Sequence, residues 1–331
     1  MGRGPNTMTA RFRVLLTDRA WPDCDIERDI LSRVDAEIIE APDGNESTLV
    51  ELARDVDAIA TCWANVTGDV IRAANGCQVV SRFGIGLDNI DVETASALGI
   101  PITYVPDYCV PEVSDHALAL LLGLARKVAF YHQATKVGRY NLQAGPPMHR
   151  LAGRVLGLVG FGRIAQALRS KALALGLKVV AYSPSGNDYG TSCEMVSLED
   201  LLALSDFISL HAPLSDQTSK MFGAAQFEAM QPTAYLVNTS RGGLIDHEAL
   251  LDALQSGKLA GAALDVFDPE PPDLSQPLYC DERVIVTPHA GFLSAESLVE
   301  LRTRTATQIA QALQGERPEQ VVNPHVYDNR H

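Results

Sequence analysis

Short apolar segments rich in β-branched residues alternate with helical patterns along almost the whole chain. Strands are expected at residues 12–16, 58–61, 78–82 and 102–104, and later at 154–159, 178–182, 207–211, 234–238, 262–266 and 284–287. Helices are expected between them, among them 111–138, 164–175, 247–255 and 294–313. Strands that alternate with helices form parallel sheets with helices on both faces. We therefore predict an α/β fold with doubly wound parallel sheets.

Length and charge narrow the possible partners. The 331 residues are enough for two domains of about 150 residues each. Lys and Arg number 27 against 41 Asp and Glu, a formal net charge of −14. Because an acidic surface repels phosphate backbones, no nucleic acid is expected as a partner. The longest wholly apolar stretch, residues 117–125, is about half as long as a membrane span requires, so no membrane segment is expected.

The chain start and the cysteines carry further expectations. The first residues contain no apolar core of a signal peptide, and we expect residues 1–7 to be a flexible extension before Met8. Six cysteines are scattered without a CxxC pair. This usage is typical of reduced thiols in a cytoplasmic protein rather than of a disulfide or zinc framework. We expect a cytoplasmic location and no metal site.

A glycine-rich segment follows the expected strand 154–159 and opens the expected helix 164–175. It reads Gly160-Phe-Gly162-Arg163-Ile164-Ala165. Gly160 permits a tight turn, and Gly162 lets a pyrophosphate approach the backbone, where free N–H groups at the helix start bind the anion. The alternative is a strand-to-helix turn that binds nothing. The order of strand, glycines and helix favours a dinucleotide site.

The acid that usually binds the adenosine ribose in such a site is missing. The expected strand 178–182 ends in Ser183 rather than in Asp or Glu. Ser183 removes the repulsion of a 2′-phosphate, but no Lys or Arg between Lys178 and Lys220 would attract one. We therefore predict NAD(H) as the cofactor, with NADP(H) less favoured.

Three later segments place polar side chains at strand ends, where open α/β sheets bind ligands. They are Thr239-Ser240-Arg241-Gly-Gly, the acidic pair Asp265 and Glu270, and Thr-Pro-His289-Ala-Gly291. Each has a plain alternative when taken alone. Arg241 fits a surface charge, Glu270 a solvated loop acid, and His289 a buried, hydrogen-bonded histidine.

In this order, the segments together resemble the D-isomer-specific 2-hydroxyacid dehydrogenase family. The resemblance runs from about residue 13 to about residue 324 and includes Phe83-Gly-Ile-Gly-Leu-Asp88, residues 105–116 and Ser209-Leu-His211-Ala-Pro213. The C-terminal segments look most like the phosphoglycerate-dehydrogenase-like branch that contains the C-terminal-binding-protein corepressors. The resemblance implies a Rossmann NAD-binding domain (111–296) inserted in a flavodoxin-like substrate-binding domain (8–110 and 297–331), with a cleft between them.

The resemblance also implies a catalytic set of Arg241, Glu270 and His289. Arg241 would bind the substrate carboxylate and polarise the C2 carbonyl through its planar fork of donors. His289 would protonate the C2 oxygen as hydride arrives. Glu270 would favour the imidazolium, because the unperturbed histidine pKa of about 6.5 is low for an acid at neutral pH.

Two sets of binding residues follow from the same resemblance. The cofactor would be bound by Gly160, Gly162, Arg163, Ile164, Ser183, His211, Pro213, Thr239, Ser240, Arg241, Asp265, His289 and Gly291, with Asp265 holding the nicotinamide carboxamide. The substrate would be bound by Trp63, Ile85, Gly86, Arg241, His289 and Phe292. Cys62 and Trp63 stand where phosphoglycerate dehydrogenases typically carry arginine, so an unphosphorylated substrate is expected. His116, in an apolar helical pattern, is expected to be structural.

The favoured function is therefore that of an NAD-dependent oxidoreductase. It would transfer a hydride between the nicotinamide and C2 of a small 2-oxo or D-2-hydroxy acid. The alternative is a dinucleotide-sensing corepressor or scaffold of the C-terminal-binding-protein type, and the intact set of Arg241, Glu270 and His289 favours the enzyme. The resemblance further implies a homodimer, to which helix 111–138 contributes.

Overall fold

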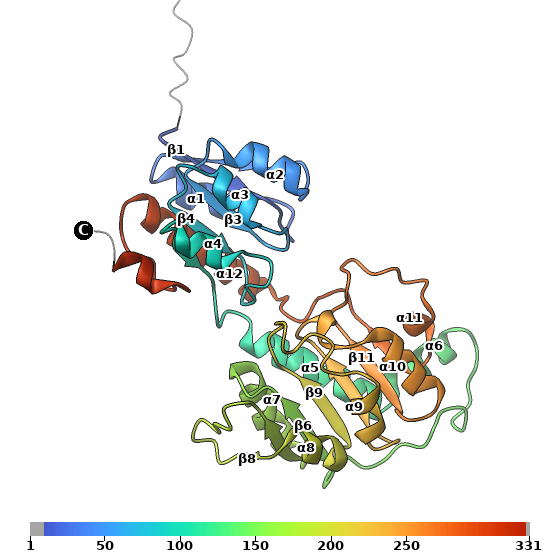
Figure 1. Cartoon of the computed structure of the whole chain (residues 1–331). Helices are drawn as coiled ribbons and strands as arrows, with labels where there is room; N and C mark the ends of the chain where they lie inside the picture. Colours follow the sequence, from blue (N-terminus) through green and yellow to red (C-terminus); the bar gives the residue numbers. More distant parts are fainter. Residues whose placement is uncertain (1–9, 329–331) are drawn as a thin grey trace, which may run out of the picture. The chain divides into compact units, whose positions relative to one another are not determined.

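The computed structural model describes residues 10–328, which fold as two compact units (Figure 1). The described residues up to Tyr108 and those from Ser294 onward form one unit, and Cys109–Leu293 form the other. The chain thus leaves the first unit, builds the second and returns. The expected flexible extension at residues 1–7 lies outside the described residues. The predicted boundaries fall within a few residues of these, and the assignment of substrate binding to the first unit stays a prediction.

The first unit is built on a parallel sheet of five strands in the order β2-β1-β3-β4-β5. Its strands are β1 (Phe12–Leu16), β2 (Ala36–Glu40), β3 (Ala58–Thr61), β4 (Val79–Arg82) and β5 (Ile102–Thr103). Its helices are α1 (Asp25–Ser32), α2 (Glu46–Ala53), α3 (Gly68–Ala73), α4 (Val92–Ala97), α12 (Ala295–Leu313) and the 3-10 turn η2 (Pro324–Tyr327). This strand order is that of flavodoxin-like folds, as predicted.

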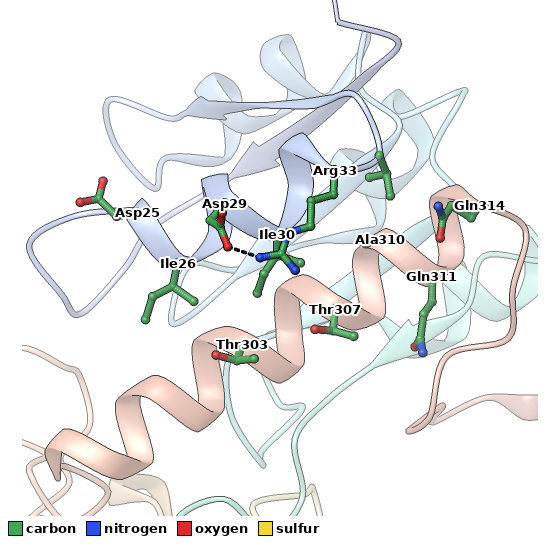
Figure 2. A pocket seen from close by; sticks show the side chains of 11 residues that line it. Asp25, Ile26, Asp29, Ile30, Arg33, Thr303, Thr307, Ala310, Gln311 and Gln314 are labelled. Carbon is green, nitrogen blue, oxygen red and sulfur yellow. Dashed lines mark hydrogen bonds and ion pairs between the residues drawn. The ribbon is translucent and has the colours of Figure 1, made fainter.

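The C-terminal segment is an integral part of this unit. Arg302 of α12 donates two hydrogen bonds to the buried carboxylate of Glu27 on α1, at 2.9 and 2.8 Å. The buried Asn323 accepts from the Ile102 N–H and donates to the Ile100 carbonyl, which ties the tail to β5. An open hollow of about 710 Å³ lies between α1 and α12 (Figure 2). It contains none of the predicted site residues.

The second unit is built on a parallel sheet of seven strands in the order β12-β11-β10-β9-β6-β7-β8. The strands are β6 (Val155–Val159), β7 (Lys178–Tyr182), β8 (Glu194–Met195), β9 (Phe207–Leu210), β10 (Tyr235–Asn238), β11 (Gly261–Leu264) and β12 (Val284–Val286). The helices are α5 (Val110–Ala125), α6 (Val128–Lys136), α7 (Arg163–Ala174), α8 (Leu198–Leu204), α9 (Ala224–Ala229), α10 (His247–Gln255), α11 (Pro277–Cys280) and the 3-10 turn η1 (Gly242–Leu244). The strand order reverses between β6 and β9, which is the doubly wound arrangement of a Rossmann fold.

Helices cover both faces of this sheet. On one face, Leu121 of α5 and Leu168 of α7 pack on Leu156 and Leu158 of β6. On the other face, Leu201 of α8 packs with Ile208 and other side chains of the central strands. The predicted α/β class with two doubly wound parallel sheets is therefore confirmed. Among residues 10–328, no helix is both long and apolar enough to cross a membrane.

The helix expected at residues 111–138 is interrupted. Helix α5 ends at Ala125 and α6 begins at Val128, with Lys127 between them in the left-handed region at φ +55°. The buried Lys127 ammonium lies 4.5 Å from the centre of the Tyr235 ring on β10. The prediction of one continuous helix is therefore wrong: the backbone turns at Lys127, and the Lys127 side chain packs on a residue far away in the sequence.

Candidate active site

The carboxyl edge of the seven-stranded sheet gathers most of the predicted site residues. Gly160 follows β6, Ser183 follows β7, His211 follows β9, Thr239 to Arg241 follow β10, Asp265 follows β11 and His289 lies beyond β12. All the strands are parallel, so these positions share one edge of the sheet. Ligands of open α/β sheets bind at this edge, next to the point where the strand order reverses.

The glycine-rich loop joins β6 to α7 and leaves room for an anion. Gly160 has φ +88°, and a Cβ there would lie 2.6 Å from the carbonyl carbon and oxygen of His211, so only glycine fits. A Cβ on Gly162 would meet no atom within 4 Å, which shows open space at the N-terminus of α7. The first turn of α7 contains no acidic residue and begins with Arg163. This helix start therefore offers N–H donors and a positive charge to a phosphate.

The loops after β7 and β9 lie on either side of the glycine loop. Ser183 is half-buried, and its hydroxyl lies 3.3 Å from that of Ser185. The Nε2 atom of His211 lies 2.9 Å from the Ser209 hydroxyl. Burial lowers the pKa of His211 to about 4, so its imidazole is neutral at physiological pH. His211 is thus a polar, uncharged group at this edge of the sheet.

A buried asparagine holds the loop that contains Arg241. The Asn238 side chain donates to the Arg241 carbonyl at 2.8 Å and accepts from the Ser240 N–H at 3.0 Å. The Ser240 hydroxyl donates to the Leu210 carbonyl at 2.7 Å, which ties this loop to the end of β9. The half-buried Arg241 donates to the Ser240 carbonyl. The hydroxyl of Thr239 is buried and has no hydrogen-bond partner among residues 10–328.

His289 and Glu270 form a hydrogen-bonded pair. The His289 Nδ1 atom lies 2.8 Å from Glu270 Oε2, and Glu270 Oε1 accepts the Phe267 N–H at 2.8 Å. A carboxylate accepts, so Nδ1 carries the proton of this bond and Nε2 is the ring nitrogen suited to exchange a proton with a bound acid. The ring of Phe292 packs edge-on against His289, with 6.0 Å between ring centres.

The buried Asp265 anchors the turn that contains His289. Its carboxylate accepts hydrogen bonds from the Thr287 hydroxyl at 2.5 Å and from the N–H groups of Ala290 and Gly291 at 2.9 and 2.8 Å. Burial alone would raise the pKa of Asp265, but hydrogen bonds from His116, Thr287 and Ala290 outweigh it and hold the pKa below its ordinary value. Asp265 is therefore an ionised anchor of the turn, a role that the sequence pattern did not indicate.

The loops predicted to bind substrate in the first unit have their own anchors. The Asp18 carboxylate accepts from the N–H groups of Cys62 and Trp63 at 2.9 and 2.6 Å, and the Trp63 side chain is 44% exposed. Ile85 and Gly86 are half-buried residues, and their N–H groups have no acceptor among the described residues. The sequence analysis did not identify Asp18, because its partners lie 44 and 45 residues further along the chain, nor Asn238, although its partners Ser240 and Arg241 are close in the sequence.

Comparison with known proteins identifies the family. Residues 118–291 match the model described as "D-isomer specific 2-hydroxyacid dehydrogenase, NAD binding domain". The chain belongs to this family. It is 36% identical over 291 residues to a hydroxypyruvate reductase of Thermotoga maritima, covering 87% of this chain and 94% of that one. It is 37% identical over 298 residues to a glyoxylate reductase of Korarchaeum cryptofilum, and the match covers 87% of this chain and 88% of the reductase.

A solved structure of this 2-hydroxyacid dehydrogenase family has the same fold. The D-lactate dehydrogenase of Aquifex aeolicus, complexed with NAD and lactic acid, superimposes with a TM-score of 0.84 at 25% identity, covering 94% of this chain and 99% of that one. The predicted family, the oxidoreductase class and NAD(H) as the cofactor are confirmed. These relatives are enzymes and lend no support to the corepressor alternative.

The residues of the dehydrogenase fit its cofactor. The open space at Gly162, the unobstructed helix start at Arg163 and the unpartnered Thr239 hydroxyl all lie at the sheet edge where a dinucleotide binds in this fold. No group of three or more His, Cys, Asp or Glu among residues 10–328 is arranged to hold a metal ion.

Proposed function

We propose that this dehydrogenase reduces the C2 carbonyl of a small, unphosphorylated 2-oxo acid to a D-2-hydroxy acid, or catalyses the reverse oxidation. The observation that carries the proposal is the hydrogen-bonded pair of His289 and Glu270 at the carboxyl edge of an NAD-binding sheet. Such a pair holds one ring nitrogen as a donor to a carboxylate and presents the other for proton transfer.

Each residue of the set has a distinct role. Arg241 binds the substrate carboxylate with two parallel hydrogen bonds and polarises the C2 carbonyl. NADH, when bound, supplies the hydride that C2 receives. His289 donates its Nε2 proton to the C2 oxygen, so that the carbonyl becomes a hydroxyl. Glu270, held by the Phe267 N–H, stabilises the imidazolium before the transfer and keeps the ring oriented.

Cofactor binding follows from the loops at the same edge. We assign the pyrophosphate to Gly160, Gly162, Arg163 and Ile164, because the helix start there is unobstructed. We assign the adenosine ribose to Ser183. His211 and Pro213 are assigned to the part of the cofactor next to this ribose. Thr239, Ser240, Gly291 and the turn held by Asp265 complete the nicotinamide end.

The substrate is proposed to be unphosphorylated. Residues 61–67 contain no Lys or Arg, and Trp63 presents an exposed apolar surface where a phosphate-binding arginine would be needed. The N–H groups of Ile85 and Gly86 suit a carboxylate. Phe292, packed on His289, adds an aromatic wall for a short side chain.

The test is a spectrophotometric assay of NADH oxidation by the full chain. The panel is glyoxylate, hydroxypyruvate, pyruvate, 2-oxobutyrate, phenylpyruvate, 4-methyl-2-oxovalerate and 3-phosphohydroxypyruvate. Reduction of at least one unphosphorylated acid, with a D-configured product wherever C2 becomes a stereocentre, supports the proposal. No turnover with any of them, or a preference for 3-phosphohydroxypyruvate, would overturn it.

We also propose that the protein is a homodimer. Residues 126–154 contain six Lys and Arg and no Asp or Glu, in a chain whose net charge is −14, and four of the six are exposed: Arg126, Lys136, Arg139 and Arg150. The same segment exposes the apolar side chains of Val137, Tyr140 and Leu142, at 68%, 95% and 83%. A basic, apolar segment of an acidic protein suits an acidic surface of a second copy. Sedimentation should show a dimer that Tyr140→Ser with Leu142→Ser weakens; a monomer at every concentration would contradict this.

A cytoplasmic location completes the proposal. All six cysteines lie within residues 10–328, and none of them forms a disulfide. Thiols of this kind are typical of a reducing compartment. Cell fractionation with an antibody against the full chain tests the location.

A further inference from the structure

His116, expected to be a structural residue of an apolar helix, contacts both sides of the turn that contains His289. Its Nε2 atom lies 2.9 Å from the Thr287 hydroxyl, two residues before His289, and 3.2 Å from Asp265 Oδ1. A Cβ on Gly291, two residues after His289, would lie 3.5 Å from His116 Cδ2. The imidazole of α5 therefore lies directly against the 287–291 turn.

The hydrogen-bond network determines where the proton of His116 lies. Asp265 is ionised and can only accept, so the single hydroxyl hydrogen of Thr287 is donated to Asp265 Oδ1 at 2.5 Å. The Thr287 oxygen can then only accept from His116. Nε2 of His116 must therefore carry a hydrogen, which it shares between Thr287 and Asp265.

The turn held by this network is strained. His289 has φ +54°, in the left-handed region that non-glycine residues rarely adopt. Its N–H donates to the Asp265 carbonyl at 2.8 Å, and the next two N–H groups donate to the Asp265 carboxylate. Such a conformation persists only where its surroundings hold it. The orientation of the Asp265 carboxylate, fixed by Thr287 and His116, is part of what holds it.

We propose that His116 is a positioning residue for the reaction: its Nε2–H donor, acting through Thr287 and Asp265, holds the backbone of His289 in the conformation that proton transfer requires. This inference rests on the proposed function, because it assigns His289 as the proton donor. His116 itself contacts neither substrate nor reacting atoms in this role.

The experiment compares donor-keeping and donor-free variants of the full chain. His116→Gln retains an N–H donor at the same reach, whereas His116→Leu retains bulk only. In single-turnover reduction of the best 2-oxo acid, His116→Leu should slow hydride transfer about tenfold or more, with KM for the acid changed less than about threefold. His116→Gln should recover most of the rate. His325→Leu, an exposed histidine of the first unit, is the control and should match the wild type.

A double-mutant cycle separates positioning from general packing. Thr287→Val removes the hydroxyl that links His116 to Asp265. If both residues act on His289 through one network, the double variant should be no slower than the slower single variant. In the absence of cofactor, ¹⁵N-histidine NMR should show a slowly exchanging Nε2 proton on His116, and Thr287→Val should speed its exchange.

The outcomes are distinct. Wild-type protein that reduces no 2-oxo acid overturns the proposed function and this inference with it. An active wild type with His116→Leu within about twofold of its rate, or with His116→Gln as slow as His116→Leu, overturns this inference alone. Additive losses in the cycle, or an Nε2 without a proton, overturn it as well.

Discussion

The backbone of Gly242 lies directly against the backbone of Phe267. A Cβ on Gly242 would come within 2.0 Å of the Phe267 carbonyl carbon and 2.1 Å of its oxygen. Gly242 follows Arg241, and the Phe267 N–H holds Glu270. The loop that contains the proposed carboxylate-binding residue is thus packed against the loop that contains the partner of the proposed acid.

Gly242→Ala should therefore damage stability and activity together. The added methyl cannot be accommodated without separating the two loops, so we expect a loss of about 3 kcal/mol in the free energy of unfolding. Urea titration measures it. Gly243→Ala is the matched control, because its Cβ would meet only side-chain atoms at 3.2 Å or more. An equal loss in both variants would show that the Gly242 contact is not special.

His289→Ala should lower kcat by about 10²–10⁴-fold while NADH still binds, because the acid is lost and the cofactor loops remain. Stopped-flow reduction and fluorescence titration with NADH measure the two effects separately. Near-normal turnover would remove His289 from the mechanism.

Glu270→Gln should act on the pH profile rather than abolish turnover. The amide no longer favours the imidazolium, so the fall in reduction rate with rising pH should begin at lower pH. Glu282→Gln, on an exposed residue of the same unit, is the control. An unchanged profile for Glu270→Gln would contradict the pairing seen in the structure.

Trp63 should govern substrate choice. Trp63→Arg should raise kcat/KM for 3-phosphohydroxypyruvate about tenfold relative to pyruvate, since it introduces a phosphate partner in the loop held by Asp18. Trp63→Phe keeps an aromatic side chain and should keep the wild-type preference. If all three proteins rank the substrates alike, Trp63 lies outside the specificity determinants.

The segment that follows β7 should favour NADH, and Ser183 should make this preference weaker than an acid would. We expect a higher kcat/KM with NADH than with NADPH, because no Lys or Arg between residues 178 and 220 can pair with a 2′-phosphate. Ser183→Asp should lower kcat/KM for NADPH about tenfold more than for NADH, through repulsion of the phosphate. A wild-type preference for NADPH would show that a cation reaches this site from another part of the chain.

His211 should make the free energy of unfolding decrease at acidic pH. Its pKa of about 4 in the folded protein lies below the ordinary value of 6.5, so the unfolded chain binds the additional proton first. The stabilising effect of the neutral imidazole is complete above about pH 6.5 and is lost as the pH falls toward 4, by up to about 3 kcal/mol. His211→Gln should remove this part of the pH dependence in urea titrations, and His149→Gln, on an exposed residue, should not.

The sequence by itself determined the fold class, the family and most of the local structure. The strands at 12–16, 58–61 and 178–182 and the helix at 247–255 occur at the predicted residues. The physical reason is that these signals are local. The periodicity of apolar residues, the glycines at turns and the residues that begin helices all involve residues that are neighbours in the sequence. They constrain the backbone before any distant contact forms.

Only the tertiary structure decided the features that join distant residues. A helix whose sequence pattern is continuous is interrupted at Lys127, and the Lys127 ammonium lies over the distant Tyr235 ring. Asp18 binds N–H groups 44 and 45 residues away, and His116 contacts Thr287 across 171 residues. Hydrogen bonds form only between groups that lie about 3 Å apart. Which distant side chains come that close depends on how the sheets and helices pack, and this cannot be deduced from their spacing in the sequence.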